Sequence, residues 1–174
     1  TQGIEVNYVA GASIGALIGA YYAAYPDLSG LERLIFEFNR QKGFRLFDPA
    51  LRGGLLKGNR LEEFLKDMLD GATFEKLRVP FTAVATDFNT GEEVLLKNGS
   101  LIKAIRASIS IPAIFQPIWY QDRLLADGGM SNPVPVTSVR DMGSDIVIAV
   151  NLDNAVFPLS KKHLPVVSRI PMHG

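Results

Sequence analysis

A serine flanked by two glycines is the residue of this sequence best suited to covalent chemistry. Residues 9–20 are V-A-G-A-S-I-G-A-L-I-G-A, which places Ser13 between Gly11 and Gly15. This Gly-x-Ser-x-Gly pattern is typical of a nucleophile elbow, a sharp strand-to-helix turn that exposes the serine Oγ. A helix that begins at Ile14 would direct its free N–H groups at the same place, where negative charge develops during acyl transfer. The pattern therefore favours an acyl hydrolase, with the Ile14 N–H as a weaker candidate for the oxyanion donor.

Three other interpretations of this segment stay open. The uncharged run Val9–Tyr25 has glycines at the small-xxx-small spacing of packed transmembrane helices, although it is short for a bilayer span. A dinucleotide-binding turn would need glycine where Ser13 stands. The third interpretation is a buried Gly/Ala helix with an incidental serine.

A second motif is A-D-G-G at residues 126–129, directly after the apolar run I-W-Y-Q-D-R-L-L. An aspartate at this position would lie at the carboxyl edge of a sheet, where catalytic residues of open α/β folds gather. Alone, Asp-Gly is also a common hairpin signal. Together with Ser13, Asp127 is a candidate catalytic partner.

These two motifs, with A-T-D-F-N-T-G-E, I-R-A-S-I-S-I-P-A-I-F-Q-P and G-G-M-S-N-P-V-P-V between and after them, resemble the bacterial patatin-like phospholipases. Those proteins are lipid acyl hydrolases related to plant patatin. The resemblance extends from Ile4 to about Asp153. It implies that Ser13 is the nucleophile, Asp127 its partner in a serine–aspartate dyad, and a phospholipid or other fatty acyl ester the substrate. It implies no metal or organic cofactor. The supporting glycines of the two motifs are Gly11, Gly15, Gly128 and Gly129.

In a dyad, the aspartate must move the proton. Asp127 would take the Ser13 proton as Oγ attacks an ester carbonyl and return it to the departing alcohol. A buried position beside two glycines would raise its pKa and make it a better base. A Ser-His-Asp triad that uses His163 is the alternative, since His163 and His173 are the two histidines of the chain.

The family resemblance also implies a glycine-rich oxyanion loop upstream of the elbow, and only a short stretch precedes Ser13 here. The pair Gly53-Gly54 lies downstream and predicts a turn. We expect residues 1–174 to form a single patatin-like domain without the N-terminal strand and this loop, and to have little activity as such, since one lost oxyanion donor costs about 10²- to 10³-fold in rate. A catalytically silent lipid-binding or regulatory module is therefore a further alternative.

Composition narrows the function classes. The chain has 174 residues, 47% of them hydrophobic, which is ample for one core. Its formal net charge of zero argues against nucleic-acid binding. The lack of cysteine excludes disulfides and fits a cytoplasmic setting, with peripheral membrane contact as an additional expectation. The adjacent pairs Glu62-Glu63 and Glu92-Glu93 predict solvated surface rather than a metal site.

Apolar periodicity predicts alternating strands and helices. Strands are expected at Ile4–Ala10, Phe81–Asp87, Glu92–Lys97 and, fully buried, Asp145–Leu152. Helices are expected at Ile14–Tyr25, at Leu31–Arg40, from a cap at Asn59 with Glu62 as a capping box, and from a cap at Ser100 through Ala107. This order predicts an α/β fold, a three-layer α/β/α domain with a mixed, mainly parallel central sheet.

A few other residues invite a functional interpretation. Asp87 is expected to be a structural turn residue. Asn132, beside two prolines, is expected to fix the turn after the second motif. The group Phe115, Ile118 and Trp119 predicts core or an acyl-chain pocket. The segment Gly43–Leu56 predicts either a wall of an apolar cleft that touches membrane or an ordinary connection.

Overall fold

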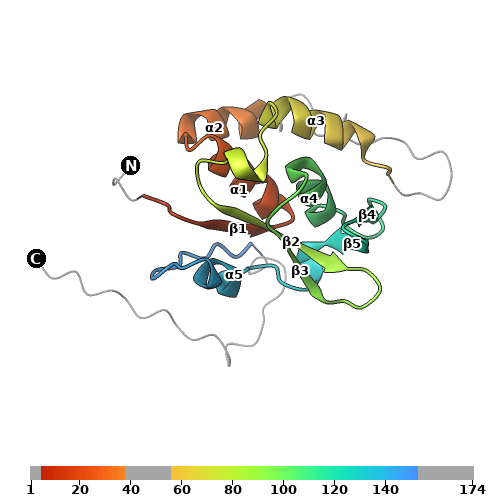
Figure 1. The fold of residues 1–174 in the computed structure, drawn as a ribbon. Coiled ribbons are helices and arrows are strands. Elements are labelled where there is room, and N and C mark those ends of the chain that lie inside the picture. Colours follow the sequence, from red (N-terminus) through yellow and green to blue (C-terminus); the bar gives the residue numbers. More distant parts are fainter. Residues whose placement is uncertain (1–4, 38–55, 153–174) are drawn as a thin grey trace, which may run out of the picture.

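The computed structural model describes residues 5–37 and 56–152, which form a five-stranded sheet between helices (Figure 1). Its strands are β1 (Val9–Ala12), β2 (Phe81–Asp87), β3 (Glu93–Leu96), β4 (Ile118–Tyr120) and β5 (Arg123–Asp127). Its helices are α1 (Ile14–Ala24), α2 (Leu28–Glu37), α3 (Asn59–Leu69), α4 (Leu101–Ser108) and α5 (Val136–Asp141), with short 3-10 turns η2 (Phe74–Lys76) and η3 (Gly128–Met130). Helices α1 and α4 cover one face of the sheet and α5 lies on the other.

Strand β2 is the centre of the sheet, and every one of its residues is buried. One of its edges pairs with β3, antiparallel, over Ala83–Thr86. The other edge is shared by two strands placed end to end: β1 pairs in parallel with Phe81–Val84, and β5 pairs antiparallel with Ala85–Asp87. Because β1 and β5 run in opposite directions, their carboxyl ends meet at the middle of β2.

Small side chains hold α1 close to the sheet. Ala16, Ala20 and Ala23 are fully buried and face the core with Phe81 of β2. Alanine loses no side-chain entropy in a helix, so this packing is compatible with strong helix propensity. The start of α1 is therefore fixed against the strands that carry the carboxyl ends described above.

The expected α/β fold with a mixed sheet between helix layers is confirmed. Parallel strands do not predominate as expected: among the described strands β1–β2 is the parallel pair, whereas β2–β3, β2–β5 and β4–β5 are antiparallel. Short connections are the physical reason for two of these antiparallel pairs, β2–β3 and β4–β5. Gln121 and Asp122, both with positive φ, form the two-residue turn between β4 and β5.

Most helix boundaries follow the sequence closely, but α2 begins at Leu28 rather than at the predicted Leu31, and one cap differs. Ser100 caps α4 as predicted, its Oγ accepting a hydrogen bond from the Lys103 N–H at 3.3 Å. The sequence predicts Asn59 as the cap of α3. In the structure Asn59 is the first residue of that helix, and Gly58, with a φ of 78°, is the cap. The uncharged run 9–25 is divided between β1 and α1. Within the described part of the chain, no helix is both long and apolar enough to cross a bilayer.

The strand predicted at Asp145–Leu152 is not formed in the described part, which ends at Leu152. Ile146, Ile148 and Val150 are 75%, 76% and 74% exposed, and the segment has no strand partner among the described residues. The described ladder of β1 is with β2 alone, and a cleft lies between β1 and this segment. An apolar run predicts a buried strand correctly only where a neighbouring strand reaches it.

A buried arginine ties α4 to the chain around it. Arg106 is fully buried; its Nη1 donates to Ser110 Oγ at 2.7 Å, and its Nη2 donates to the carbonyls of Lys57 at 2.8 Å and Gln116 at 3.3 Å. The guanidinium carbon also lies 5.0 Å from the centroid of the Phe115 ring. These contacts fix the carboxyl end of α4 against two loops.

We expect Arg106→Met to lower the free energy of unfolding by about 3 kcal/mol, because methionine keeps an apolar stem but leaves two carbonyls without their donor. Urea denaturation measures this change. The control is Lys103→Met on the exposed side of the same helix, with an expected effect within about 0.5 kcal/mol. Equal effects of the two substitutions would contradict a bonding role for Arg106.

Candidate active site

Ser13 occupies a strained turn between β1 and α1. Its φ of 54° and ψ of −125° form a combination that costs a non-glycine residue about 1–3 kcal/mol and persists only where the surroundings enforce it. A Cβ on Gly11 would overlap the Gly15 carbonyl, so Gly11 is required for the strand to pass this close to the helix. The predicted strand-to-helix turn is present at Ser13.

Ser13 and Asp127 are hydrogen-bonded, although 114 positions separate them in the sequence. The Ser13 Oγ donates to Asp127 Oδ2 at 2.7 Å. The register explains the contact: Ala12 is opposite Val84 of β2, and Asp127 is opposite the next residue, Ala85. The two strand ends meet on one edge of β2. Ser13, which follows β1, and Asp127, which ends β5, therefore lie side by side.

Asp127 is held from four directions. Its Oδ1 accepts a hydrogen bond from the Gly129 N–H at 2.8 Å, beside the Ser13 contact at Oδ2. Its own N–H donates to the Ser110 carbonyl at 3.0 Å, and its carbonyl accepts from Thr86 Oγ1 at 2.7 Å. The carboxylate is therefore oriented toward Ser13 before any ligand arrives.

Burial decides the protonation behaviour of Asp127. The residue is 6% exposed, and this desolvation raises its pKa above the ordinary aspartate value. Hydrogen bonds from Ser13 and Gly129 stabilise the carboxylate and act in the opposite direction, but burial is the larger effect. The result is a carboxylate that is more basic than a solvated one.

The glycines after Asp127 have different uses. A Cβ on Gly128 would overlap the Val84 carbonyl, so only glycine fits where the chain leaves β5. Gly129 supplies the N–H donor to Asp127. The motif predicts that Gly15 supports the elbow, but a Cβ there would meet nothing within 4 Å, so the structure does not require glycine at this position. Gly11 and Gly128 are therefore required to be glycine by the backbone packed against them, and Gly129 contributes its backbone N–H.

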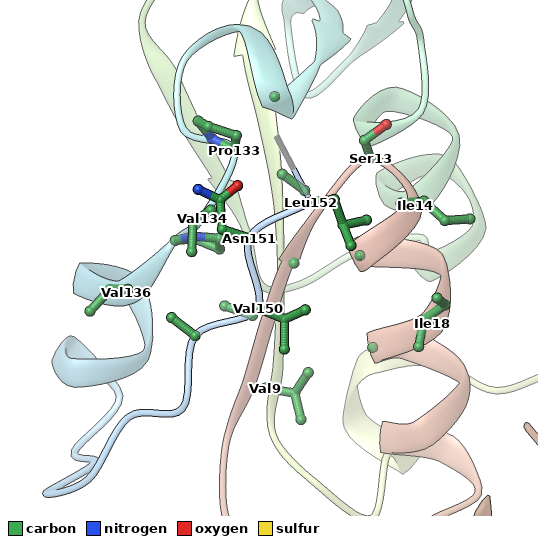
Figure 2. Close-up of a pocket in the computed structure, with 18 of the residues that line it drawn as sticks. Val9, Ser13, Ile14, Ile18, Pro133, Val134, Val136, Val150, Asn151 and Leu152 are labelled. Atoms are coloured by element: carbon green, nitrogen blue, oxygen red, sulfur yellow. The ribbon is translucent and has the colours of Figure 1, made fainter. Parts of the chain in front are cut away.

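An apolar cleft of about 720 Å³ opens beside the pair (Figure 2). Ser13 and Asp127 belong to its lining, and Figure 2 shows Ser13 where β1 passes into α1. The remaining walls are mostly aliphatic. They include Val9 of β1, Ile18 of α1 and Val150 of the segment 147–152. Such a cleft fits an apolar chain better than a charged ligand.

Backbone N–H groups at the start of α1 also belong to the site. The first turn of a helix has N–H groups without an intrahelical acceptor, and the Ile14 N–H opens that turn. The Ser13 N–H is already used, since it donates to Ser108 Oγ at 2.9 Å. Ile14 is therefore a more suitable oxyanion donor than Ser13 itself.

Ser108 and Ser110 contact the pair, and sequence reasoning gave them no role. Both stand in I-R-A-S-I-S-I-P, where two serines follow a helical stretch at a spacing of two. Both are fully buried. Small polar residues at a buried helix end were the available signal, because such groups need hydrogen-bond partners.

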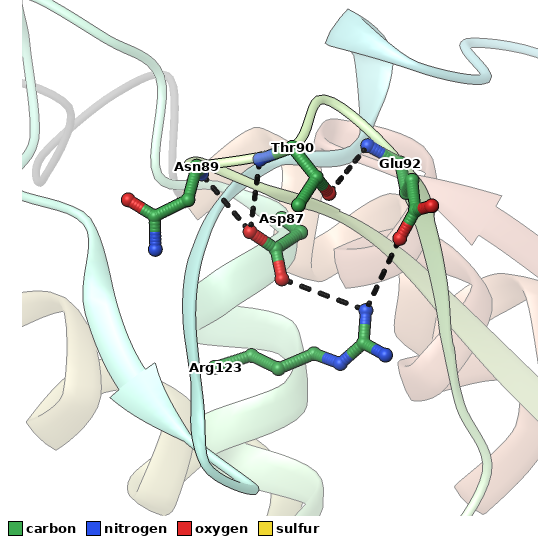
Figure 3. Close-up of polar contacts among 5 residues, drawn as sticks. All are labelled: Asp87, Asn89, Thr90, Glu92 and Arg123. Carbon is green, nitrogen blue, oxygen red and sulfur yellow. Dashed lines mark hydrogen bonds and ion pairs between the residues drawn. The ribbon is translucent and has the colours of Figure 1, made fainter.

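Asp87 is a turn residue, as predicted (Figure 3). Its Oδ1 accepts hydrogen bonds from the N–H groups of Asn89 at 2.9 Å and Thr90 at 3.3 Å. Its Oδ2 lies 3.5 Å from Nη1 of Arg123, which also lies 3.8 Å from Glu92 Oε2. These contacts stabilise the connection between β2 and β3, away from Ser13.

The remaining predicted residues divide between core, surface and undescribed parts. Phe115 is buried in the core, Ile118 is half-buried and Trp119 is 69% exposed; none of them lines the cleft. Asn132 fixes the turn as predicted, its N–H donating to the Gly128 carbonyl at 2.9 Å. The predictions for residues 43–55, including Gly53 and Gly54, and for His163 and His173 lie outside the described residues. Within residues 5–37 and 56–152, no group of three or more His, Cys, Asp or Glu could hold a metal ion.

We expect Gly11→Ala and Gly15→Ala to affect stability in opposite ways. The first places a Cβ against the α1 backbone and should lower the free energy of unfolding by at least about 2 kcal/mol. The second enters open space in a helix, where alanine is favoured over glycine by about 0.5–1 kcal/mol. Thermal unfolding measures both, and similar losses at the two positions would contradict the close approach at Gly11.

We expect Asp127→Asn to become more favourable for stability as the pH rises. A raised folded-state pKa means that the contribution of Asp127 is greatest at low pH and is lost as pH rises through the folded pKa. Asparagine does not ionise, so the melting temperature of the variant relative to the unsubstituted chain should rise from pH 4 to pH 8. Asp67→Asn, at an exposed position on α3, is the matched control. A difference that falls with pH would contradict burial as the dominant effect.

Known proteins resemble this chain along most of its length. The family model of patatin-like phospholipase matches residues 2–140. An uncharacterized NTE family protein of Mycobacterium tuberculosis is 34% identical over 155 residues, an alignment that covers 88% of this chain and 43% of the relative. A patatin-like phospholipase domain-containing protein of Caenorhabditis elegans is 32% identical over 157 residues, covering 87% of this chain and 12% of the relative.

The fold also matches a solved structure. The crystal structure of VipD from Legionella pneumophila superposes with a TM-score of 0.59 at 14% identity, covering 71% of this chain and 40% of VipD. The chain thus spans less than half the length of each of these proteins. The match of the family model over residues 2–140 shows that this chain belongs to the patatin-like phospholipase family.

Proposed function

We propose that the protein is a serine acyl hydrolase that cleaves phospholipids or other fatty acyl esters through Ser13 and Asp127. The observation that supports this most directly is the 2.7 Å hydrogen bond from Ser13 Oγ to Asp127 Oδ2 at the wall of an apolar cleft. Family membership supports lipid acyl hydrolysis in general. The dyad and the substrate are the finer parts of the proposal.

Asp127 acts as the base and then as the acid. As Ser13 Oγ attacks the ester carbonyl carbon, Oδ2 takes the hydroxyl proton along the existing hydrogen bond. When the tetrahedral intermediate collapses, the carbon–oxygen bond to the alcohol breaks and Asp127 returns the proton to the leaving alkoxide. Water then attacks the acyl-serine, Asp127 takes one water proton, and Ser13 Oγ recovers it as the fatty acid leaves.

The oxyanion of the intermediate is stabilised at the start of α1. The Ile14 N–H and the positive end of the helix dipole lie next to Ser13, where the charge forms. The helix supplies this stabilisation without reorganising. One backbone donor by itself is a modest oxyanion hole.

The acyl chain occupies the cleft, and the mouth meets the lipid surface. The lining is aliphatic along α1 and β1, so a fatty chain gains from burial there. Ile14, Ile111 and Met130 also line the cleft and are 42%, 38% and 55% exposed. These side chains are suited to peripheral contact with a membrane that presents the substrate.

The test is hydrolysis of a para-nitrophenyl acyl ester by this chain and by a version extended at its N-terminus. We expect Ser13→Ala and Asp127→Ala each to lower kcat by at least about 10³-fold, since nucleophile and base act as a unit. The rate should rise with pH through the pKa of Asp127, which burial holds above the ordinary aspartate value, because only the carboxylate accepts the proton.

Covalent labelling separates the alternatives. A fluorescent organophosphonate should label Ser13 in the unsubstituted chain and fail to label Ser13→Ala. His163→Gln should hydrolyse and label normally; a loss comparable to that of Asp127→Ala would favour the Ser-His-Asp triad instead. If neither version of the chain hydrolyses ester or takes up the label, the proposal is wrong and a catalytically silent lipid-binding module is the better account.

A further inference from the structure

The N–H group of Ser13 has a partner far away in the sequence. Ser108, the last residue of α4, accepts its hydrogen bond on Oγ at 2.9 Å. Ser108 is fully buried, and 95 positions separate the two residues. The contact therefore joins the turn that carries Ser13 to a helix on which neither member of the pair lies.

The conformation of Ser13 makes this partner necessary. Ser13 stands between the ladder of β1 and the first turn of α1, so neither element supplies an acceptor for its N–H. An N–H group that is partly shielded from water and lacks an acceptor is unfavourable, and the Ser13 N–H is partly buried. The φ of 54° also requires an external contact to hold it. The Ser108 hydroxyl answers both requirements at the backbone of Ser13.

The same end of α4 also holds the second member of the pair. The Ser110 carbonyl accepts the Asp127 N–H at 3.0 Å, and Arg106 Nη1 donates to Ser110 Oγ at 2.7 Å. Residues 108 and 110 thus each bind the backbone of one member. Their contacts fix the two backbones, while the 2.7 Å bond between Oγ and Oδ2 joins the two side chains.

We infer that Ser108 is a positioning residue for ester hydrolysis, which holds the Ser13 backbone so that Oγ points at Asp127 and at an incoming carbonyl. The inference rests on the proposed function, because it assigns Ser108 to the same reaction. Ser108 lies outside the cleft lining and touches no substrate there. Its loss should therefore change the rate of the chemical step and leave substrate affinity largely unchanged.

We expect Ser108→Ala to lower kcat by at least about 10-fold with KM within about twofold, since a small displacement of a nucleophile strongly reduces rate. Hydrogen–deuterium exchange of the Ser13 amide should become faster in the variant, because its acceptor is gone. Ser108→Cys is the second variant: it fills the buried site, but sulfur is a weak acceptor, so the same loss is expected if the alanine variant does not fold.

Ser138→Ala is the matched control, since Ser138 is a buried serine on α5 without a contact to Ser13 or Asp127. It should keep both kcat and Ser13 amide exchange. A Ser108 variant that folds with kcat within about twofold of the unsubstituted chain, or with unchanged Ser13 exchange, would overturn the inference. The rate measurements use the N-terminally extended version where the unextended chain is inert. If both versions are as inert as Ser13→Ala, the proposed function fails and the positioning role in hydrolysis is overturned with it; the exchange data then report the contact alone.

Discussion

The site depends on two strands that share one edge of β2. Strand β1 runs parallel to β2 and β5 runs antiparallel to it, so their carboxyl ends meet between Val84 and Ala85. Two distant parts of the sequence thereby place the Ser13 hydroxyl next to the Asp127 carboxylate, and the strand pairing alone brings them together. The junction is crowded, and Gly128 is the residue type that lets the chain leave it past the Val84 carbonyl.

The surroundings of this junction set the chemistry of Asp127. A carboxylate at the edge of an exposed sheet would be well solvated and weakly basic. Here the helices on both faces bury β2 and the end of β5, and the desolvation raises the pKa of Asp127. The Gly129 N–H donates one hydrogen bond to the carboxylate; as a neutral group, it stabilises the ionised form less than a cationic side chain would. The same packing that stabilises the sheet therefore makes the aspartate a base.

Part of this arrangement could be predicted from sequence. The glycine-framed serine, the Asp-Gly-Gly motif and the bounds of β2 are local patterns, and local patterns are visible in one sequence. The pairing of β2 with β1 and β5, the open space at Gly15 and the contact of Ser108 with Ser13 depend on residues distant in the chain. Asp145–Leu152 shows the same limit, because its composition is typical of a buried strand and its surroundings are not.

Within residues 5–37 and 56–152, one edge of β1 has no strand partner. Among the described residues, β1 forms its ladder with β2 alone, and the neighbouring segment leaves Ile146, Ile148 and Val150 largely in solvent. Unpaired strand edges beside exposed aliphatic side chains are templates for pairing with another chain. Such an edge favours the addition of a strand from another chain, and that strand would lie beside the cleft that Ser13 lines.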